Sequence, residues 1–129
     1  MTHRRIIDEN NALLEEIIQG KFVQVRTQEG DQLVLGNLNE TRHAQILTRF
    51  LNRKSLIYTM IEDSMGDQVP QPNGDSYSLI GAGSYEVKGK NKKLTVGGLS
   101  SSYGIGPEIP SLRSIVDVDL PEWRLVEAK

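Results

Sequence analysis

Our expectations about the fold start from the stretch Lys21-Phe-Val-Gln-Val-Arg-Thr-Gln-Glu-Gly-Asp-Gln-Leu-Val-Leu35. Side chains alternate in character from Lys21 to Thr27, with two valines on one face, and this period of two is typical of a β-strand. The following Glu29-Gly30-Asp31 has the composition of a turn, and the apolar residues up to Leu35 fit a returning strand. The stretch therefore predicts a β-hairpin.

Helices are expected on both sides of this hairpin. A short helix over roughly 10–19 is indicated by four apolar residues at helical spacing, Leu13, Leu14, Ile17 and Ile18. After the hairpin, a polar connection ends at Thr41, a good N-cap, and an amphipathic helix follows, indicated by Ile46, Leu47, Phe50 and Leu51. The run Leu56–Met60 either continues this helix or forms a buried strand, because periodicity does not distinguish the two.

The second half of the chain predicts another hairpin and a last helix. Residues 62–76 are rich in turn formers and read as a mobile loop. Strands are expected over 77–87, with a glycine-rich interruption, and over 94–99, joined by a basic turn. A helix over 109–118 and a strand over 123–126 complete the chain. We expect one domain over 1–129 of the α/β (α+β) class, a mixed sheet of about five or six strands flanked by two or three helices.

Composition narrows the classes of function. The chain has 129 residues, no cysteine and a formal net charge of -2. The lack of cysteine excludes disulfides, thiolate metal sites and a cysteine nucleophile. The small negative charge gives no global attraction to nucleic acid or to an anionic membrane, and no run approaches the ~20 apolar residues of a membrane span. We therefore expect a cytoplasmic protein with neither nucleic acid nor membrane as a partner.

His43 is the central candidate for chemistry. At the start of a helix, free backbone N–H groups bind anions, and the helix dipole disfavours an imidazolium. A neutral histidine there can take a proton from water or attack phosphorus itself. The alternative is a solvated histidine on a polar helix face. The other histidine, His3, is assigned no role.

Three further features are weaker candidates, each with a structural alternative. Ser100, Ser101 and Ser102 open a glycine-rich loop that either forms an anion-binding nest or is a flexible surface loop. Gly81-Ala82-Gly83 marks a bulge or a close approach to the backbone, or only a bend of the sheet. Lys21 reaches a phosphate or is an exposed edge lysine. The carboxylates Asp63, Asp67 and Asp75 fit no calcium loop and are interpreted as solvating residues.

The order of these pieces resembles the phosphohistidine phosphatase (Janus/Ocnus) family, over roughly residues 19 to 127. The resemblance is carried by Lys21, His43-Ala44, Gly81-Ala82-Gly83, Lys92-Lys93, Ser100–Gly104, Ser111–Val116, Pro121 and Trp123–Val126. It implies hydrolysis of phosphate from protein histidine, or from a related phosphoramidate, without a metal or a cofactor. A phosphorylated protein or a small phosphoramidate is then the partner, and the oligomeric state is left open.

The resemblance also implies roles for individual residues. His43 is the base that activates water or the nucleophile, and both remain open. The phosphate is held by the N–H groups of His43 and Ala44, by the loop Ser100–Ser102 and by Lys21, while Gly81 lets the backbone come close.

The chain departs from the family pattern at two positions near this site. Ser84 stands where well-known members have an arginine after the glycine kink, and Arg42 stands where a tyrosine often precedes the histidine. Arg42 is therefore a candidate for supplying the missing guanidinium. Residues 62–76 look like an insertion. Two other interpretations remain, a non-catalytic module that binds phosphate or protein and an unrelated small α/β interaction domain.

Overall fold

The computed structural model describes residues 5–8, 11–37, 40–72 and 77–128. One mixed sheet of six strands in the order β1-β3-β2-β6-β7-β8 forms its centre, with parallel pairs at the two edges and antiparallel pairs between them. The strands are β1 (Ile6–Ile7), β2 (Ile18–Thr27), β3 (Gly30–Leu35), β6 (Tyr77–Lys88), β7 (Lys93–Gly97) and β8 (Arg124–Glu127). With two α-helices packed on it, this sheet confirms the expected fold class.

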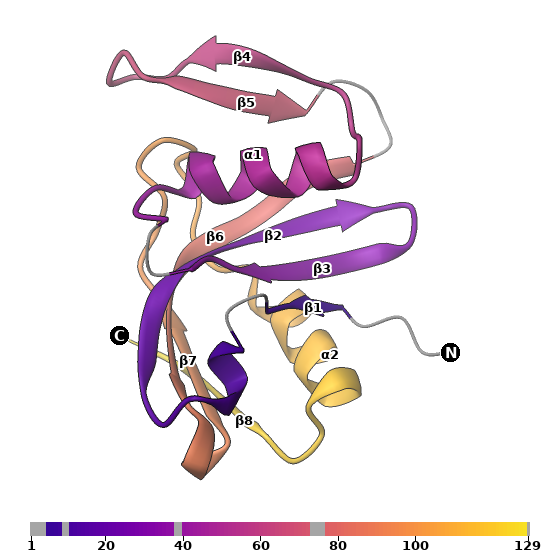
Figure 1. The fold of residues 1–129 in the computed structure, drawn as a ribbon, viewed down its shortest axis with the longest axis vertical. Helices are drawn as coiled ribbons and strands as arrows, with labels where there is room; N and C mark the ends of the chain where they lie inside the picture. The colour runs from indigo at the N-terminus through magenta and orange to yellow at the C-terminus, as the bar shows by residue number, and fades with distance from the viewer. Residues whose placement is uncertain (1–4, 9–10, 38–39, 73–76, 129) are drawn as a thin grey trace.

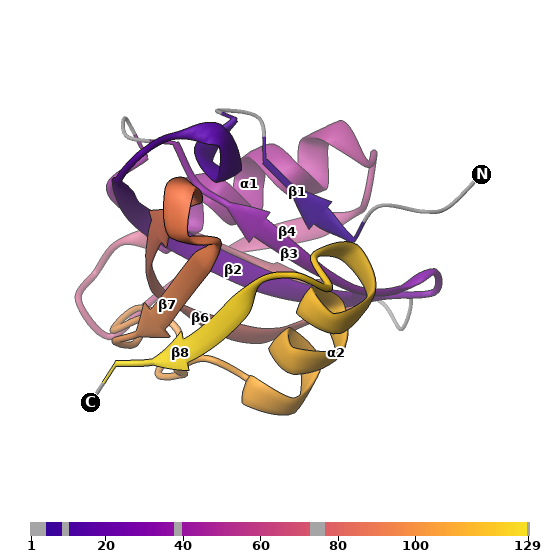
Figure 2. The same cartoon turned by 90° about the horizontal axis from the view of Figure 1, so that it is seen from below.

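The two α-helices lie on opposite faces of the sheet (Figures 1 and 2). Helix α1 (His43–Arg53) covers one face and α2 (Ile109–Asp119) the other. Consecutive β2 residues therefore enter two different cores: Val23 packs with the α1 side and Phe22 with the α2 side, and both are fully buried. Because both faces are covered, the middle of β2 is buried at every position instead of at every second one.

Residues 58–72 form a separate two-stranded hairpin over the outer side of α1 (Figure 1). Its strands are β4 (Tyr58–Glu62) and β5 (Gln68–Pro72). Over 56–60 the chain forms a strand that begins at Tyr58, but the expectation of a buried strand is wrong, because β4 is exposed from Thr59 to Glu62. The loop predicted over 62–76 is wrong for Glu62 and for 68–72. The prolines of β5 hide a strand in the sequence, yet a two-stranded sheet consists of edge strands, where missing N–H groups are tolerated.

The helix predicted over 10–19 is wrong. Only the 3₁₀ turn η1 (Ala12–Leu14) forms, and the Asp8 carboxylate accepts hydrogen bonds from the N–H groups of Ala12 and Leu13. The backbone is already in an extended conformation at Glu15. Strand β2 starts at Ile18, which pairs with Val87 of β6. Pairing with β6 thus overrides the local helical pattern, and Asn10, at the start of the predicted helix, lies outside the described residues.

The second hairpin and the last helix agree with expectation. β6 and β7 pair directly, joined by the 3₁₀ turn η2 (Gly89–Asn91), and α2 and β8 follow in the predicted places. The glycine interruption of β6 coincides with a bulge, because the register with β2 shifts between Gln24 and Val25. Among the described residues, no helix has the length and apolar character needed to cross a membrane.

Candidate functional site

A pocket of about 190 Å³ lies at the N-terminus of α1. We call it the His43 pocket. It collects residues from four segments that are distant in the sequence: β2, the start of α1, the β4–β5 turn and the loop after β7. They are Lys21, Thr41, Arg42, His43, Met65, Asp67, Leu99, Ser101 and Ser102. Three residues that the resemblance associates with phosphate, Lys21, Ser101 and Ser102, therefore line one cavity together with His43, and so does Arg42, the candidate for the missing guanidinium.

His43 is the buried group of this pocket, with only 6% of its surface exposed. Its Nε2 lies 2.9 Å from the backbone oxygen of Gly83. A carbonyl oxygen only accepts, so Nε2 carries the proton and donates it to this bond. Burial lowers the pKa of His43 below its ordinary value of 6.5, the nearby Lys21 ammonium lowers it further, and the Gly83 bond opposes both. The ring is therefore neutral near pH 7, with Nδ1 as its unprotonated nitrogen.

The first turn of α1 presents backbone donors beside this histidine. The N-cap is Arg42, one residue later than expected, and its side chain accepts no hydrogen bond; Gln45 Oε1 instead accepts from the N–H groups of Thr41 and Arg42 at 3.0 and 3.1 Å. The Gln45 N–H donates to the Arg42 carbonyl. The N–H groups of His43 and Ala44 thus have no acceptor among the described residues, as is usual in a first turn, and are available to an anion.

Charge in the pocket is unevenly distributed. Lys21 forms no ion pair within the part of the chain that the structure describes. Arg42 Nη2 lies 2.9 Å from Asp67 Oδ2, so that guanidinium is already neutralised by the β4–β5 turn. The lining therefore has one uncompensated positive charge, at half-buried Lys21, close enough to His43 to affect its pKa. An anion is the kind of ligand that this charge favours.

The three serines of the loop after β7 do not all line the pocket. Ser101 and Ser102 line the pocket, whereas Ser100 is fully buried and does not. Ser100 holds the loop together: its N–H donates to the Ile105 carbonyl, its carbonyl accepts from the Gly104 N–H, and its Oγ accepts from the Tyr103 N–H. Ser100 therefore shapes the loop that carries the other two serines.

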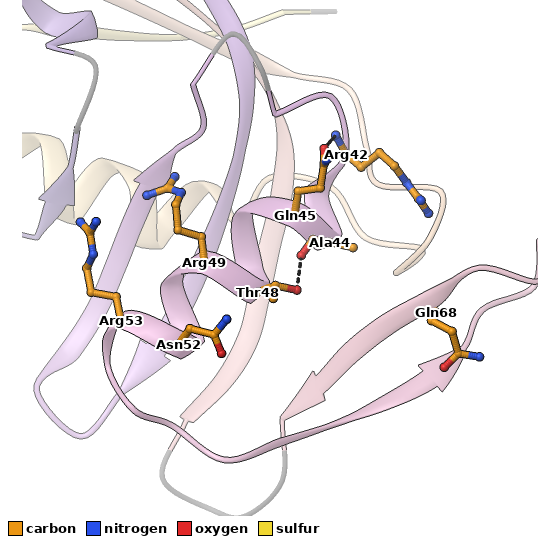
Figure 3. A pocket seen from close by; sticks show the side chains of 8 residues that line it. All are labelled: Arg42, Ala44, Gln45, Thr48, Arg49, Asn52, Arg53 and Gln68. Carbon is orange, nitrogen blue, oxygen red and sulfur yellow. Dashed lines mark hydrogen bonds between the residues drawn. The ribbon is translucent and has the colours of Figure 1, made fainter.

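Ala44 faces a different hollow, of about 610 Å³, between α1 and the β4–β5 hairpin (Figure 3). The hollow is lined by Arg42, Ala44, Gln45, Thr48, Arg49, Asn52, Arg53 and Gln68. Two of its polar side chains are engaged: the Thr48 hydroxyl donates to the Ala44 carbonyl, and Arg49 donates twice to the Glu40 carboxylate. It contains no histidine, and we do not regard it as the reaction site. Arg42 lines both cavities.

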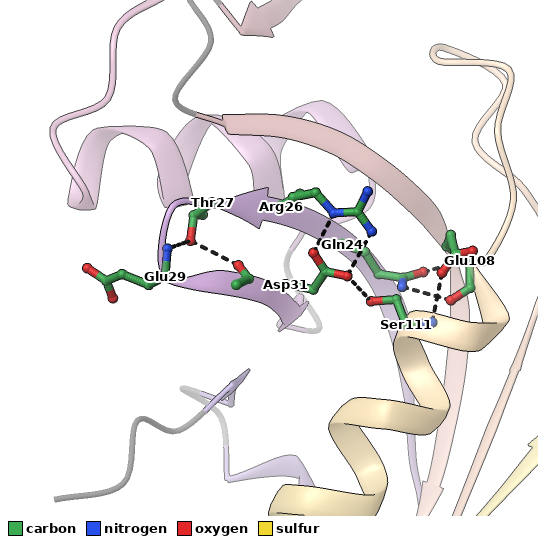
Figure 4. Close-up of polar contacts among 8 residues, drawn as sticks. Gln24, Arg26, Thr27, Glu29, Asp31, Glu108 and Ser111 are labelled. Carbon is green, nitrogen blue, oxygen red and sulfur yellow. Dashed lines mark hydrogen bonds and ion pairs between the residues drawn. The ribbon is translucent and has the colours of Figure 1, made fainter.

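Gly81 does not reach the His43 pocket. A Cβ at this position would lie 2.3 Å from Gln24 Oε1 and 2.9 Å from the Glu108 nitrogen. The close approach that the sequence suggested is thus made by the buried Gln24 amide, which bridges to both backbone groups of Glu108 at the start of α2 (Figure 4). Gly81 makes room for this link between the sheet and α2, and no phosphate approaches it there.

Sequence reasoning missed two features of this site. Asp67 and Met65, interpreted as parts of a solvated loop, line the pocket through the β4–β5 turn. The signal was present in the chain: Asp63-Ser-Met-Gly-Asp67 has the composition of a tight turn, and Asp63 Oδ1 accepts from the N–H groups of Met65 and Asp67, both at 2.9 Å. Ser84 stands where the resemblance would place an arginine. It lines a neighbouring hollow, to whose lining Lys21 also contributes.

Comparison with protein-family models and with curated proteins gives no match for this chain. Among the described residues, no group of three or more histidine, aspartate or glutamate side chains has the arrangement of a metal site. The function is therefore argued from the geometry of the His43 pocket and the resemblance of its residues.

Proposed function

We propose that the chain is a metal-independent phosphohydrolase that removes phosphate from phosphohistidine or a related phosphoramidate. One observation carries the proposal: a buried, neutral His43 with an unprotonated Nδ1 lines the same small cavity as Lys21, Ser101 and Ser102. The resemblance to the phosphohistidine phosphatases supports the same reaction. A phosphorylated protein or a small phosphoramidate is the proposed partner, and the cytoplasm the proposed location.

The residues divide the work of phosphoryl transfer in a simple way. The N–H groups of the first turn of α1, the serine hydroxyls and the Lys21 ammonium offer fixed donors and positive charge to the phosphoryl oxygens. Such preorganised donors are the main source of catalysis when charge develops on a transferring phosphoryl group. In the base pathway, His43 takes a proton from water as the water oxygen bonds to phosphorus and the P–N bond breaks. The leaving nitrogen keeps the electron pair of that bond and takes a proton from the imidazolium that His43 has become, which restores the neutral ring.

In the nucleophile pathway, the imidazole nitrogen itself bonds to phosphorus as the P–N bond of the substrate breaks, and the leaving nitrogen keeps the electron pair and takes a proton from solvent. Water then bonds to phosphorus, the bond between phosphorus and His43 breaks, and phosphate and the neutral imidazole are released. The two pathways share the same pocket but differ in one observable species. A rapid quench during turnover detects phosphate bound covalently to the protein only in the nucleophile pathway. Its absence at every time point assigns His43 as the base.

The test of the proposal is hydrolysis of a phosphoramidate by wild type and by two His43 variants. His43→Gln removes the basic Nδ1 but keeps an amide N–H that can donate to the Gly83 carbonyl, so it is the variant that retains the buried hydrogen bond. We expect its kcat/KM to fall at least about 100-fold, the usual contribution of a positioned acid–base group. His43→Ala should lose activity to the same degree and also stability. Activity in His43→Gln equal to wild type would contradict the proposal.

A non-catalytic phosphate-binding module is the second candidate. It is favoured by the pairing of Arg42 with Asp67 and by Ser84, since both leave the pocket with fewer free guanidinium groups than the resemblance implies. This module would bind inorganic phosphate through Lys21 without hydrolysing phosphoramidates. Phosphate binding that is lost in Lys21→Ala, with no turnover by wild type, would establish it.

A further inference from the structure

The more buried lining residues of the His43 pocket, which we call its floor, differ in composition from the exposed ones, which we call its rim. Burial separates the two: His43 is buried and Lys21 and Ser102 are half-buried, whereas Met65 and Leu99 are exposed at 69% and 65%. The phosphoryl group belongs on the floor, with the histidine and the lysine. The remainder of a substrate must therefore leave the pocket past the exposed rim.

Among the residues that line the pocket, Asp67 is the one carboxylate, and it is held in place. The Asp63 carboxylate of the same turn is also close enough to Arg42 for that guanidinium to lower its pKa. Asp67 lies at the end of the β4–β5 turn, where its N–H donates to Asp63 Oδ1 and its side chain pairs with Arg42 at 2.9 Å. Its side chain is 46% exposed, so it faces the solvent through which a substrate enters. The hairpin is fixed to the serine loop by the Tyr103 hydroxyl, which donates to the Pro70 carbonyl at 3.0 Å.

We infer that Asp67 is a specificity-determining residue, which restricts the pocket to phosphoryl groups on a carrier without further negative charge. This inference rests on the proposed function. It follows from two effects of Asp67, which both disfavour a second anionic group at the rim. Asp67 neutralises Arg42, so the rim offers no free positive charge to a second anionic group, and its own carboxylate repels such a group.

The carrier that fits this rim is neutral or cationic and partly apolar. Imidazole, ammonium and guanidinium nitrogens meet the first condition, and the exposed Met65 and Leu99 side chains provide the apolar contact. Nucleoside polyphosphates and pyrophosphate fail the first condition, because a second phosphoryl group would lie at the carboxylate. The rim therefore selects N-phosphorylated side chains against polyphosphates.

Binding of inorganic phosphate and of pyrophosphate to the whole chain tests this inference without requiring turnover. The readout is the preference, the Kd for pyrophosphate divided by the Kd for phosphate, in which effects on the shared phosphoryl group cancel. Asp67→Asn should lower the preference about three- to fivefold in low salt, and less in high salt, because the interaction is a screened Coulomb repulsion. Arg42→Gln, which leaves the carboxylate unneutralised, should raise the preference.

Glu62→Gln is the matched control, since it removes the same charge from the same hairpin at an exposed position outside the pocket lining. It should leave the preference unchanged. Unchanged preferences in both Asp67→Asn and Arg42→Gln, with phosphate bound at the His43 pocket of wild type, would overturn this inference alone. If wild type binds no phosphate there, as followed by the amide signals of Ser101 and Ser102, the proposed function falls with it.

Discussion

Replacing Gly81 by alanine should destabilise the protein strongly, although the change adds a single methyl group. The new Cβ would lie 2.3 Å from Gln24 Oε1 and 2.8 Å from its Cδ, well inside contact distance. The Gln24 side chain is fully buried and has no free space to withdraw into without giving up its bonds. Its amide accepts from the Glu108 N–H at 2.8 Å and donates to the Glu108 carbonyl at 3.1 Å.

The size of the effect follows from these two hydrogen bonds. Each buried group that loses its partner costs about 1–3 kcal/mol, so displacing the Gln24 amide costs roughly 3–4 kcal/mol in total. Alanine in place of glycine returns about 0.5–1 kcal/mol by restricting the unfolded chain. We therefore expect the free energy of unfolding to fall by about 2–3 kcal/mol.

Urea denaturation of four proteins tests this reasoning: wild type, Gly81→Ala, Gln24→Ala and the double variant. If the clash with Gln24 is the main cause, Gly81→Ala costs much less once Gln24 has been shortened. Only the contact of the new Cβ with the Glu108 nitrogen, at 2.9 Å, then remains, so the double variant is only slightly less stable than Gln24→Ala. Phosphate affinity should be unchanged in Gly81→Ala, because this glycine lies outside the His43 pocket. A cost below about 0.5 kcal/mol for Gly81→Ala, or additive effects in the double variant, would refute the reasoning.

Three other predictions concern pH and packing. The pKa of His43 is lower in the folded than in the unfolded chain, so the folded state binds fewer protons. The stability that depends on its neutral ring should therefore be complete above about pH 6.5 and decline as the pH falls toward the folded pKa. Urea denaturation at pH 7.5 and at pH 5.5 tests this: the difference between the two free energies of unfolding should be smaller in His43→Gln than in wild type. Asp31 has a lowered pKa, chiefly through its hydrogen bond with Arg26, and it accepts from the Ser111 hydroxyl at 2.7 Å. Asp31→Asn should cost roughly 1 kcal/mol at pH 7 and less at pH 3, because the stability that comes from a lowered pKa is lost as the pH falls below the ordinary value of 3.8 toward the folded pKa; equal costs at both pH values would contradict this. Tyr103→Phe removes the bond to the Pro70 carbonyl and should cost about 1 kcal/mol, with faster hydrogen exchange in the β4–β5 hairpin and not in β2; unchanged exchange would show that this bond does not hold the hairpin.

Most of the central sheet was predictable because its signals are local, although the edge strand β1 was not predicted. The hairpin of β2 and β3 is indicated by alternating side chains and by the turn composition of residues 29–31, and each of these features is read within a few residues. The turn itself is Gln28-Glu29, because Thr27 already pairs with Gly30. Helix α2 is likewise marked by its own apolar spacing and by Pro110 in its first turn. Such elements follow from backbone preferences and burial pattern together.

The errors arose where distant parts of the chain decide the local structure. Leu14 and Ile17 have helical spacing but are exposed at 83% and 64%, because the segment after η1 is drawn out to pair with β6. The strand β5 contains two prolines, yet it pairs with β4 along its whole length and its Val69 is buried. Neither pairing is visible in a local window of sequence.

The candidate site shows the same division. His43 and its place at a helix start were accessible from the sequence, and the resemblance brought Lys21 and the serine loop into the same site. Which serines face the cavity was not accessible, because the fold of the loop around buried Ser100 decides it. Asp67 was missed because its position depends on the packing of the hairpin over α1.

The protonation state of one imidazole tests the central claim most directly. Nitrogen NMR of the His43 ring, titrated with pH and then with inorganic phosphate, should show the proton on Nε2, a pKa below 6.5, and a phosphate-induced shift of Nδ1 together with the amides of Ser101 and Ser102. Any one of three results would contradict the account: a proton on Nδ1 in place of Nε2, a His43 pKa at or above 6.5, or ring signals that do not change when phosphate is added.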